Sequence, residues 1–217
     1  MFRKTVIIIL SCVALAGAAW DFNGVDSRKV LNWRPRPGRF AVTLAFRLNV
    51  PAESIIPGKR ETVFYPLVFQ AVKPGKDHFQ KLQLAFVTKP HDRYFFAAAY
   101  PGGRYNIAWS DNGGEIPVGK PVWVFVSAAA GAIFETRVNG RNYSHVRSVG
   151  LVPLVNSAPE YKIYLGHNPY KGGVGFLKCS IDNFMLFERV LSVEEMEMIE
   201  KSAAYGNTIP GKVEISL

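Results

Sequence analysis

The segment spanning residues 175–198 constrains the fold of this chain more than any other. Up to residue 188 it is rich in aliphatic and aromatic side chains that alternate with polar ones, which is typical of a β-strand. Ser192 then precedes Glu195 by three positions. This spacing predicts a capping box, in which each side chain accepts a hydrogen bond from the other residue's backbone N–H, and it marks the start of a helix. We therefore expect a strand followed directly by a short helix.

Most of the chain upstream alternates in the same way between turn signals, and residues 40–49 have the most regular period-two pattern. Pro66 interrupts the strand expected at 63–72 and favours an edge or a bulge there. Asn139 and Gly140 predict a type I′ hairpin. The pattern predicts an all-β fold of two packed antiparallel sheets with one short C-terminal helix. Residues 20–33 are expected to hold a short strand, a turn at 23–24 and a second strand around 28–33, and further strands are expected at residues 82–86, 94–100, 104–109, 122–128, 133–138, 141–146 and 161–165.

The N-terminal residues have the features of an export signal. Two basic residues precede an apolar run, and Ala16, Gly17 and Ala18 have the small side chains of a cleavage site. Residues 1–18 are predicted to be a signal peptide, so we expect a secreted or periplasmic protein without a transmembrane span after cleavage. An uncleaved anchor is the alternative, although the run is short for a span. Cleavage would leave Cys179 as the only cysteine, so no intrachain disulfide is expected.

Four short motifs occur in order along the chain. They are Phe22-Asn23-Gly24-Val25-Asp26-Ser27, Pro-Val-Trp-Val-Phe-Val at 121–126, Arg-Val-Asn-Gly-Arg at 137–141, and Ile181-Asp182 followed by Phe187, Arg189, Leu191 and Ser192. This set resembles the laminin-G-like, concanavalin A-like jelly-roll domains of lectins and glucanases, although Asn183 stands where that family has a second Asp. The resemblance spans residues 20–200. It implies that residues 19–217 form one laminin-G-like, two-sheet jelly-roll sandwich, a size common for such folds.

Asp182 is the main candidate metal ligand. It shares strand parity with Phe184, on the expected core face, where a bare carboxylate would be costly. In related jelly rolls an Asp of this strand joins oxygens near the N-terminal strand at a structural calcium site. Carried over by that resemblance, the calcium ligands here would be Asp182, Asp21, Asn23 and Gly24. The alternative is that Asp182 caps a turn or accepts backbone N–H groups.

Basic and aromatic residues suggest a second site. The formal net charge of +9 favours acidic partners, and no nucleic-acid motif is present, so a nucleic-acid partner is not expected. Sugar rings stack on aromatic faces, and arginine binds carboxylate or sulfate with two hydrogen bonds. The alternative is that the aromatic residues belong to the core and the basic run is a solvated loop. The candidate glycan ligands are Trp33, Arg34, Arg36, Tyr100, Arg104, Tyr105 and Trp109.

Catalytic motifs of related enzymes are missing from the sequence. It has no Glu-x-Asp-x-Glu strand, which would supply the paired carboxylates of a retaining glucanase, and no Gly-x-Ser-x-Gly elbow. We therefore expect an exported, non-catalytic module that binds a polysaccharide or cell-surface glycan, with an anionic one favoured. One alternative is a structural or protein-interaction subunit of an envelope assembly, with a protein partner. The other is a divergent glycoside hydrolase or lyase.

Overall fold

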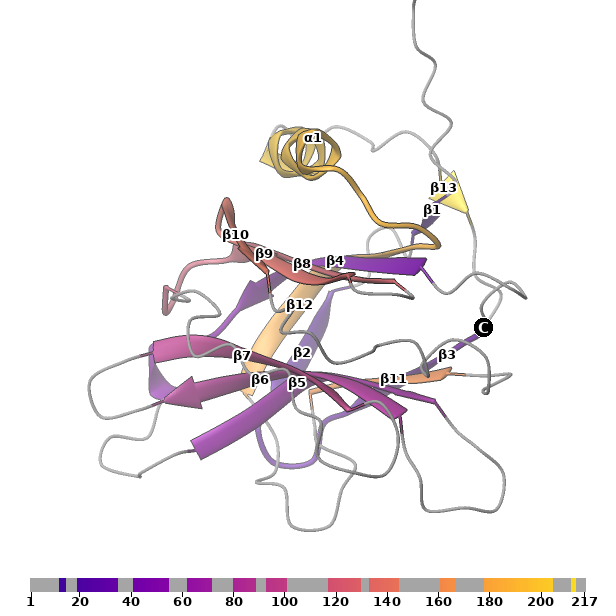
Figure 1. Ribbon diagram of the computed structural model, residues 1–217. Helices are drawn as coiled ribbons and strands as arrows, with labels where there is room; N and C mark the ends of the chain where they lie inside the picture. Colours follow the sequence, from indigo (N-terminus) through magenta and orange to yellow (C-terminus); the bar gives the residue numbers. More distant parts are fainter. Residues whose placement is uncertain are drawn as a thin grey trace, which may run out of the picture.

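The computed structural model describes residues 12–14, 19–34, 41–54, 62–71, 80–88, 93–100, 117–129, 133–144, 161–166, 178–204 and 212–213. These residues form two β-sheets, which lie one above the other, and a helix beside them (Figure 1). The expectation of an all-β, two-sheet sandwich with one short C-terminal helix is confirmed. The hairpin strand expected at 104–109 lies outside the described residues.

Eight strands make up the first sheet, called sheet A, in the order β10-β9-β8-β4-β12-β1-β13, with β2 also paired to β12. All of its pairings are antiparallel except that of β1 with β13. Its strands are β1 (Cys12–Ala14), β2 (Trp20–Asn23), β4 (Ala41–Asn49), β8 (Val122–Ala129), β9 (Ile133–Val138), β10 (Arg141–Ser144), β12 (Lys178–Phe187) and β13 (Lys212–Val213). Strand β1 lies within the predicted signal peptide, whose cleavage stays a prediction.

Sheet B has five antiparallel strands in the order β3-β11-β5-β6-β7. Of the edge or bulge expected at Pro66 the structure has the bulge, because the register between β5 and β6 shifts between Phe64 and Leu67 while β5 lies between β11 and β6. Its strands are β3 (Lys29–Trp33), β5 (Thr62–Ala71), β6 (Gln80–Thr88), β7 (Arg93–Tyr100) and β11 (Tyr161–Leu165).

The core between the sheets comes from the period-two pattern. In β4 the alternate residues Val42, Leu44, Phe46 and Leu48 are each at most 2% exposed. Phe46 stacks on Phe184 of β12 with ring centroids 6.2 Å apart. Gly166, which follows β11 of sheet B, leaves room for the ring of Phe22 from β2 of sheet A, because a Cβ at position 166 would clash with that ring.

The outer face of sheet A is covered by helix α1 (Val193–Ala204), on the side away from sheet B (Figure 1). Ser192 N donates to Glu195 Oε2 at 2.9 Å, and Glu195 N donates to Ser192 Oγ at 3.3 Å, which confirms the capping box. A second apolar cluster therefore forms beneath the helix. It contains Ala45, Phe125, Met185, Phe187, Leu191, Met196 and Ile199.

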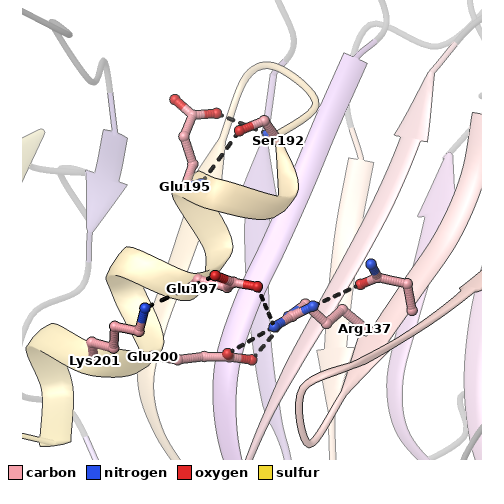
Figure 2. Close-up of polar contacts among 7 residues, drawn as sticks. Arg137, Ser192, Glu195, Glu197, Glu200 and Lys201 are labelled. Carbon is pink, nitrogen blue, oxygen red and sulfur yellow. Dashed lines mark hydrogen bonds and ion pairs between the residues drawn. The ribbon is translucent and has the colours of Figure 1, made fainter.

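A polar contact also fixes α1 to the sheet (Figure 2). Arg137 of β9 is only 6% exposed, and its Nε and Nη2 each donate to a carboxylate oxygen of Glu200 at 3.1 Å. Glu197 Oε1 lies 3.5 Å from Arg137 Nη2, and Arg137 Nη1 donates to Asn142 Oδ1 at 3.0 Å. The acidic side of the helix thus has a structural role, because it neutralises an arginine that the fold buries.

Strand β12 does not keep a single parity. Its register with β4 shifts between Asp182 and Met185, and Asn183 has a left-handed φ of 52°. Before the bulge, Ile181 is buried between the sheets, whereas after it Phe184 takes that position. The expectation that Asp182 lies on the core face with Phe184 is wrong, because the bulge places them on opposite faces. The side chain of Asp182 is 37% exposed.

The remaining local predictions can be compared directly. Asn139 and Gly140 both have positive φ angles, 48° and 77°, as the predicted type I′ hairpin between β9 and β10 requires. A short 3₁₀ turn, Ala52–Ser54, follows β4. No helix in the described part of the chain is both long enough and apolar enough to cross a membrane.

Candidate functional site

The structure describes three of the seven predicted glycan-binding residues. Trp33 is only 7% exposed, and its Nε1 donates to Glu188 Oε1 at 3.4 Å, so its ring belongs to the core rather than to an open sugar platform. Arg34 is exposed at the end of β3. Tyr100 is the last residue of β7 in sheet B. The other predicted glycan ligands, Arg36, Arg104, Tyr105 and Trp109, lie outside the described residues.

The predicted calcium ligands belong to two different local structures. Asn23 Oδ1 accepts hydrogen bonds from three successive backbone N–H groups, of residues 25 to 27, at 2.8–3.1 Å. Gly24 has a φ of 76°, and a Cβ there would lie 2.9 Å from the backbone nitrogen of Lys178. The motif at 22–27 is thus a tight turn, with Asn23 committed to holding it.

Asp21 and Asp182 lie on the same, outer face of sheet A. Asp21 is opposite Ser180, two positions before Asp182 on β12. Asp182 Oδ1 is 3.9 Å from Arg47 Nε, and it accepts a hydrogen bond from Asn183 Nδ2 at 3.1 Å. No group of three or more His, Cys, Asp and Glu side chains able to hold a metal occurs among the described residues. Calcium binding by Asp182, Asp21, Asn23 and Gly24 stays a prediction.

The outer face of sheet B has a different character. In β11, Ile163 and Leu165 are at most 1% exposed and face the core, whereas Lys162 and Tyr164 alternate with them and are half-buried. In β3, Leu31 is buried like Trp33, while Val30 and Asn32 are exposed. The alternation of a strand therefore places Lys162, Tyr164, Val30 and Asn32 on the face of sheet B that points away from sheet A.

Strand register extends this face across the whole sheet. Residues directly opposite one another in antiparallel strands lie on the same face of the sheet. All positions in a row of paired residues therefore belong to one face. The row from Leu31 through Ile163 to Ala99 is entirely apolar in sequence, and Leu31 and Ile163, at its β3 and β11 positions, are buried. The adjacent outer row, which we call the polar row, is Asn32–Lys162–Gln70–Lys81–Tyr100. The second outer row is Val30–Tyr164–Val68–Gln83–Ala98.

The two outer rows combine the groups that polysaccharides need. Lysine ammonium groups donate to carboxylates and sulfates, amide side chains donate and accept, and a tyrosine ring offers an apolar face with a polar tip. Burial raises the pKa of the Tyr164 phenol, so the hydroxyl stays a neutral hydrogen-bonding group at neutral pH. Reasoning from sequence identified only Tyr100 of the polar row. The signal that was missed is pairing register, which single-strand patterns do not contain.

Comparison with known proteins gives the fold a context. No family model matches the chain, and no curated protein matches it. Trypanosoma rangeli sialidase in complex with the inhibitor DANA matches with a TM-score of 0.55 and 17% identity, over 88% of this chain and 28% of that one. The same sialidase in complex with sialic acid gives a TM-score of 0.53 and 15% identity, over 85% of this chain and 30% of that one.

The mouse laminin α1 chain, domains LG4-5, matches with a TM-score of 0.54 and 15% identity, over 82% of this chain and 44% of that one. This chain thus spans less than a third of the sialidase chains and less than half of the laminin chain. An enzyme and a laminin share the architecture, so the architecture by itself assigns neither activity nor ligand. The likeness confirms the resemblance found in the sequence motifs, and the chain has a laminin-G-like jelly-roll fold.

Proposed function

We propose that this protein is a non-catalytic binding module that recognises an acidic glycan on the outer face of sheet B. The polar row carries the proposal, because it crosses all five strands of sheet B with hydrogen-bonding side-chain types and two lysines. The outer face of sheet A differs, since α1 packs on it and buries an apolar cluster. The formal net charge of +9, which becomes +7 if Arg3 and Lys4 leave with the predicted signal peptide, would also draw an acidic polymer toward the protein.

Binding is favoured over catalysis by the roles of the described acidic residues. In most glycoside hydrolase families, retaining hydrolysis uses two carboxylates about 5 Å apart, one protonated and one charged, at the bound sugar. Several acidic residues of this protein instead form ion pairs that join parts of the fold. These pairs are Glu53–Lys178 at 2.8 Å, Glu195–Arg189 at 2.6 Å and Glu200–Arg137 at 3.1 Å. The predicted signal peptide would deliver such a module to a secreted or periplasmic location, where glycan polymers occur.

The test is affinity electrophoresis through gels that contain an acidic or a neutral polysaccharide, with released reducing ends and unsaturated products assayed in parallel. We expect retardation only in the acidic gels, with no products. Lys162→Gln should restore mobility. Lys201→Gln is the control, because it removes the same charge from a side chain of α1 that is 74% exposed. This variant should remain retarded in the acidic gels.

Two results would overturn the proposal. Product release would show an enzyme, in agreement with the hydrolase or lyase alternative. Equal mobility in all gels would exclude glycan binding and favour the protein-interaction alternative. A pull-down from native envelopes would then test that alternative.

A further inference from the structure

Charged and neutral positions alternate along the polar row. Across sheet B the row places Asn32 on β3, Lys162 on β11, Gln70 on β5, Lys81 on β6 and Tyr100 on β7. Each lysine is therefore flanked on both neighbouring strands by a residue that is uncharged at neutral pH. A lysine therefore occurs on every second strand of the row. The pairing of the backbones sets this spacing.

Strand spacing converts this pattern into a length. Neighbouring strands are about 4.8 Å apart, so backbone positions on strands two apart are separated by roughly 9–10 Å. Lys162 and Lys81 are two strands apart, with Gln70 between them. Two linked pyranose residues advance a polysaccharide by a similar length, so an extended glycan lying across the strands would place about one sugar over each strand.

We infer that the polar row selects a polysaccharide with an acidic group on every second residue, lying across the strands of sheet B. This inference rests on the proposed glycan-binding function and specifies its ligand. Acidic sugars would lie over β11 and β6 and pair with Lys162 and Lys81. Neutral sugars would lie over β3, β5 and β7, where Asn32, Gln70 and Tyr100 supply hydrogen-bonding groups.

A polymer with an acidic group on every residue fits this row less well. Its intermediate carboxylate would lie over β5, opposite the amide of Gln70, without a cation in the row. A glycan running along a strand would meet only one lysine of the row, because the row positions on β11 and β6 belong to different strands. Both the alternation and the crossing direction are therefore needed for the two lysines to be used together.

The test measures binding by calorimetry to three oligosaccharides of equal length. Hyaluronan fragments carry a carboxylate on every second residue, oligogalacturonides carry one on every residue, and chitin fragments carry none. We expect hyaluronan fragments to bind at least about tenfold more tightly than oligogalacturonides, a difference equivalent to one hydrogen bond to a charged group. Equal or tighter binding of oligogalacturonides would refute the inference and leave the proposed function standing. Failure to bind either acidic oligomer would refute both the inference and the proposed function.

Variants test the spacing itself. Lys162→Gln and Lys81→Gln should each weaken hyaluronan binding about tenfold, and Lys201→Gln on α1 should leave it unchanged. Gln70→Lys makes three consecutive cationic positions, so it should reverse the preference toward oligogalacturonides. Thermal melting of each variant confirms that it is folded. If folded Gln70→Lys keeps the original preference, strand spacing does not set the selectivity.

Discussion

Neutralising Glu200 should loosen helix α1 from the sheet. Its carboxylate accepts two hydrogen bonds from Arg137, at 3.1 Å each, and its side chain is 20% exposed against 6% for the arginine. In Glu200→Gln the size of the side chain is kept and its charge is lost. Arg137 then loses its nearest carboxylate, and among the described residues it keeps the amide oxygen of Asn142 at 3.0 Å and the more distant carboxylate of Glu197 at 3.5 Å.

The cost follows from that geometry. Breaking a fully buried ion pair by removing one partner costs about 3–5 kcal/mol. Here the remaining partners and the partial exposure of Glu200 reduce the expected loss in the free energy of unfolding to about 2 kcal/mol. For a chain of this size, about 2 kcal/mol corresponds to a fall in Tm of roughly 4–8 °C.

Urea unfolding and thermal melting measure the effect, and Glu197→Gln is the matched control. It makes the same change one turn earlier on the helix, at a side chain that is 43% exposed and meets Arg137 at 3.5 Å. Its loss should be below about 1 kcal/mol, as for other exposed ion pairs. If the two variants lose the same stability, or if Glu200→Gln loses none, the buried pair does not hold the helix.

Three further predictions follow from local geometry. Gly166→Ala should destabilise the fold by about 2–4 kcal/mol for two reasons: the new Cβ would clash with the ring of Phe22, and residue 166 has a left-handed φ of 81°. Gly119→Ala has a similar φ of 72° with nothing within 4 Å, so it should lose only about 1 kcal/mol, and equal losses in urea titrations would exclude the clash. Burial raises the pKa of the Cys179 thiol well above its ordinary range, so alkylating reagents at about pH 8 should modify it only after unfolding, and rapid labelling of the native protein would contradict this. If calcium binds, EDTA should lower the Tm and calcium restore it, Asp182→Asn should lack that response, and a wild type indifferent to EDTA would exclude the metal.

Local features of the fold could be predicted because short stretches of sequence determine them. The capping box needs only Ser192 and Glu195, and the hairpin needs only Asn139 and Gly140, both of which the structure confirms. The bulge near Pro66 follows from the missing N–H of proline. In each case the residues that decide the geometry lie within a few positions of one another.

The candidate site was harder to predict because it depends on pairing between distant strands. Asp182 was placed on the wrong face because strict alternation ignores the bulge that Asn183 allows with its positive φ. Trp33 appeared suitable for sugar stacking, but its partner Glu188 lies 155 positions away and fixes it in the core. Lys162 and Lys81 gave no signal in their own strands, since only the register through β5 places them in one row.

Lysine footprinting with and without a bound acidic polysaccharide tests the central claim most directly. The protein is treated with an amine-reactive acylating reagent, and the modification of each lysine is read by mass spectrometry. Our account predicts that hyaluronan protects Lys162 and Lys81 together and leaves Lys201, on the opposite side of the sandwich, as reactive as before. Protection of Lys201, or unchanged reactivity of both sheet B lysines in the bound protein, would contradict it.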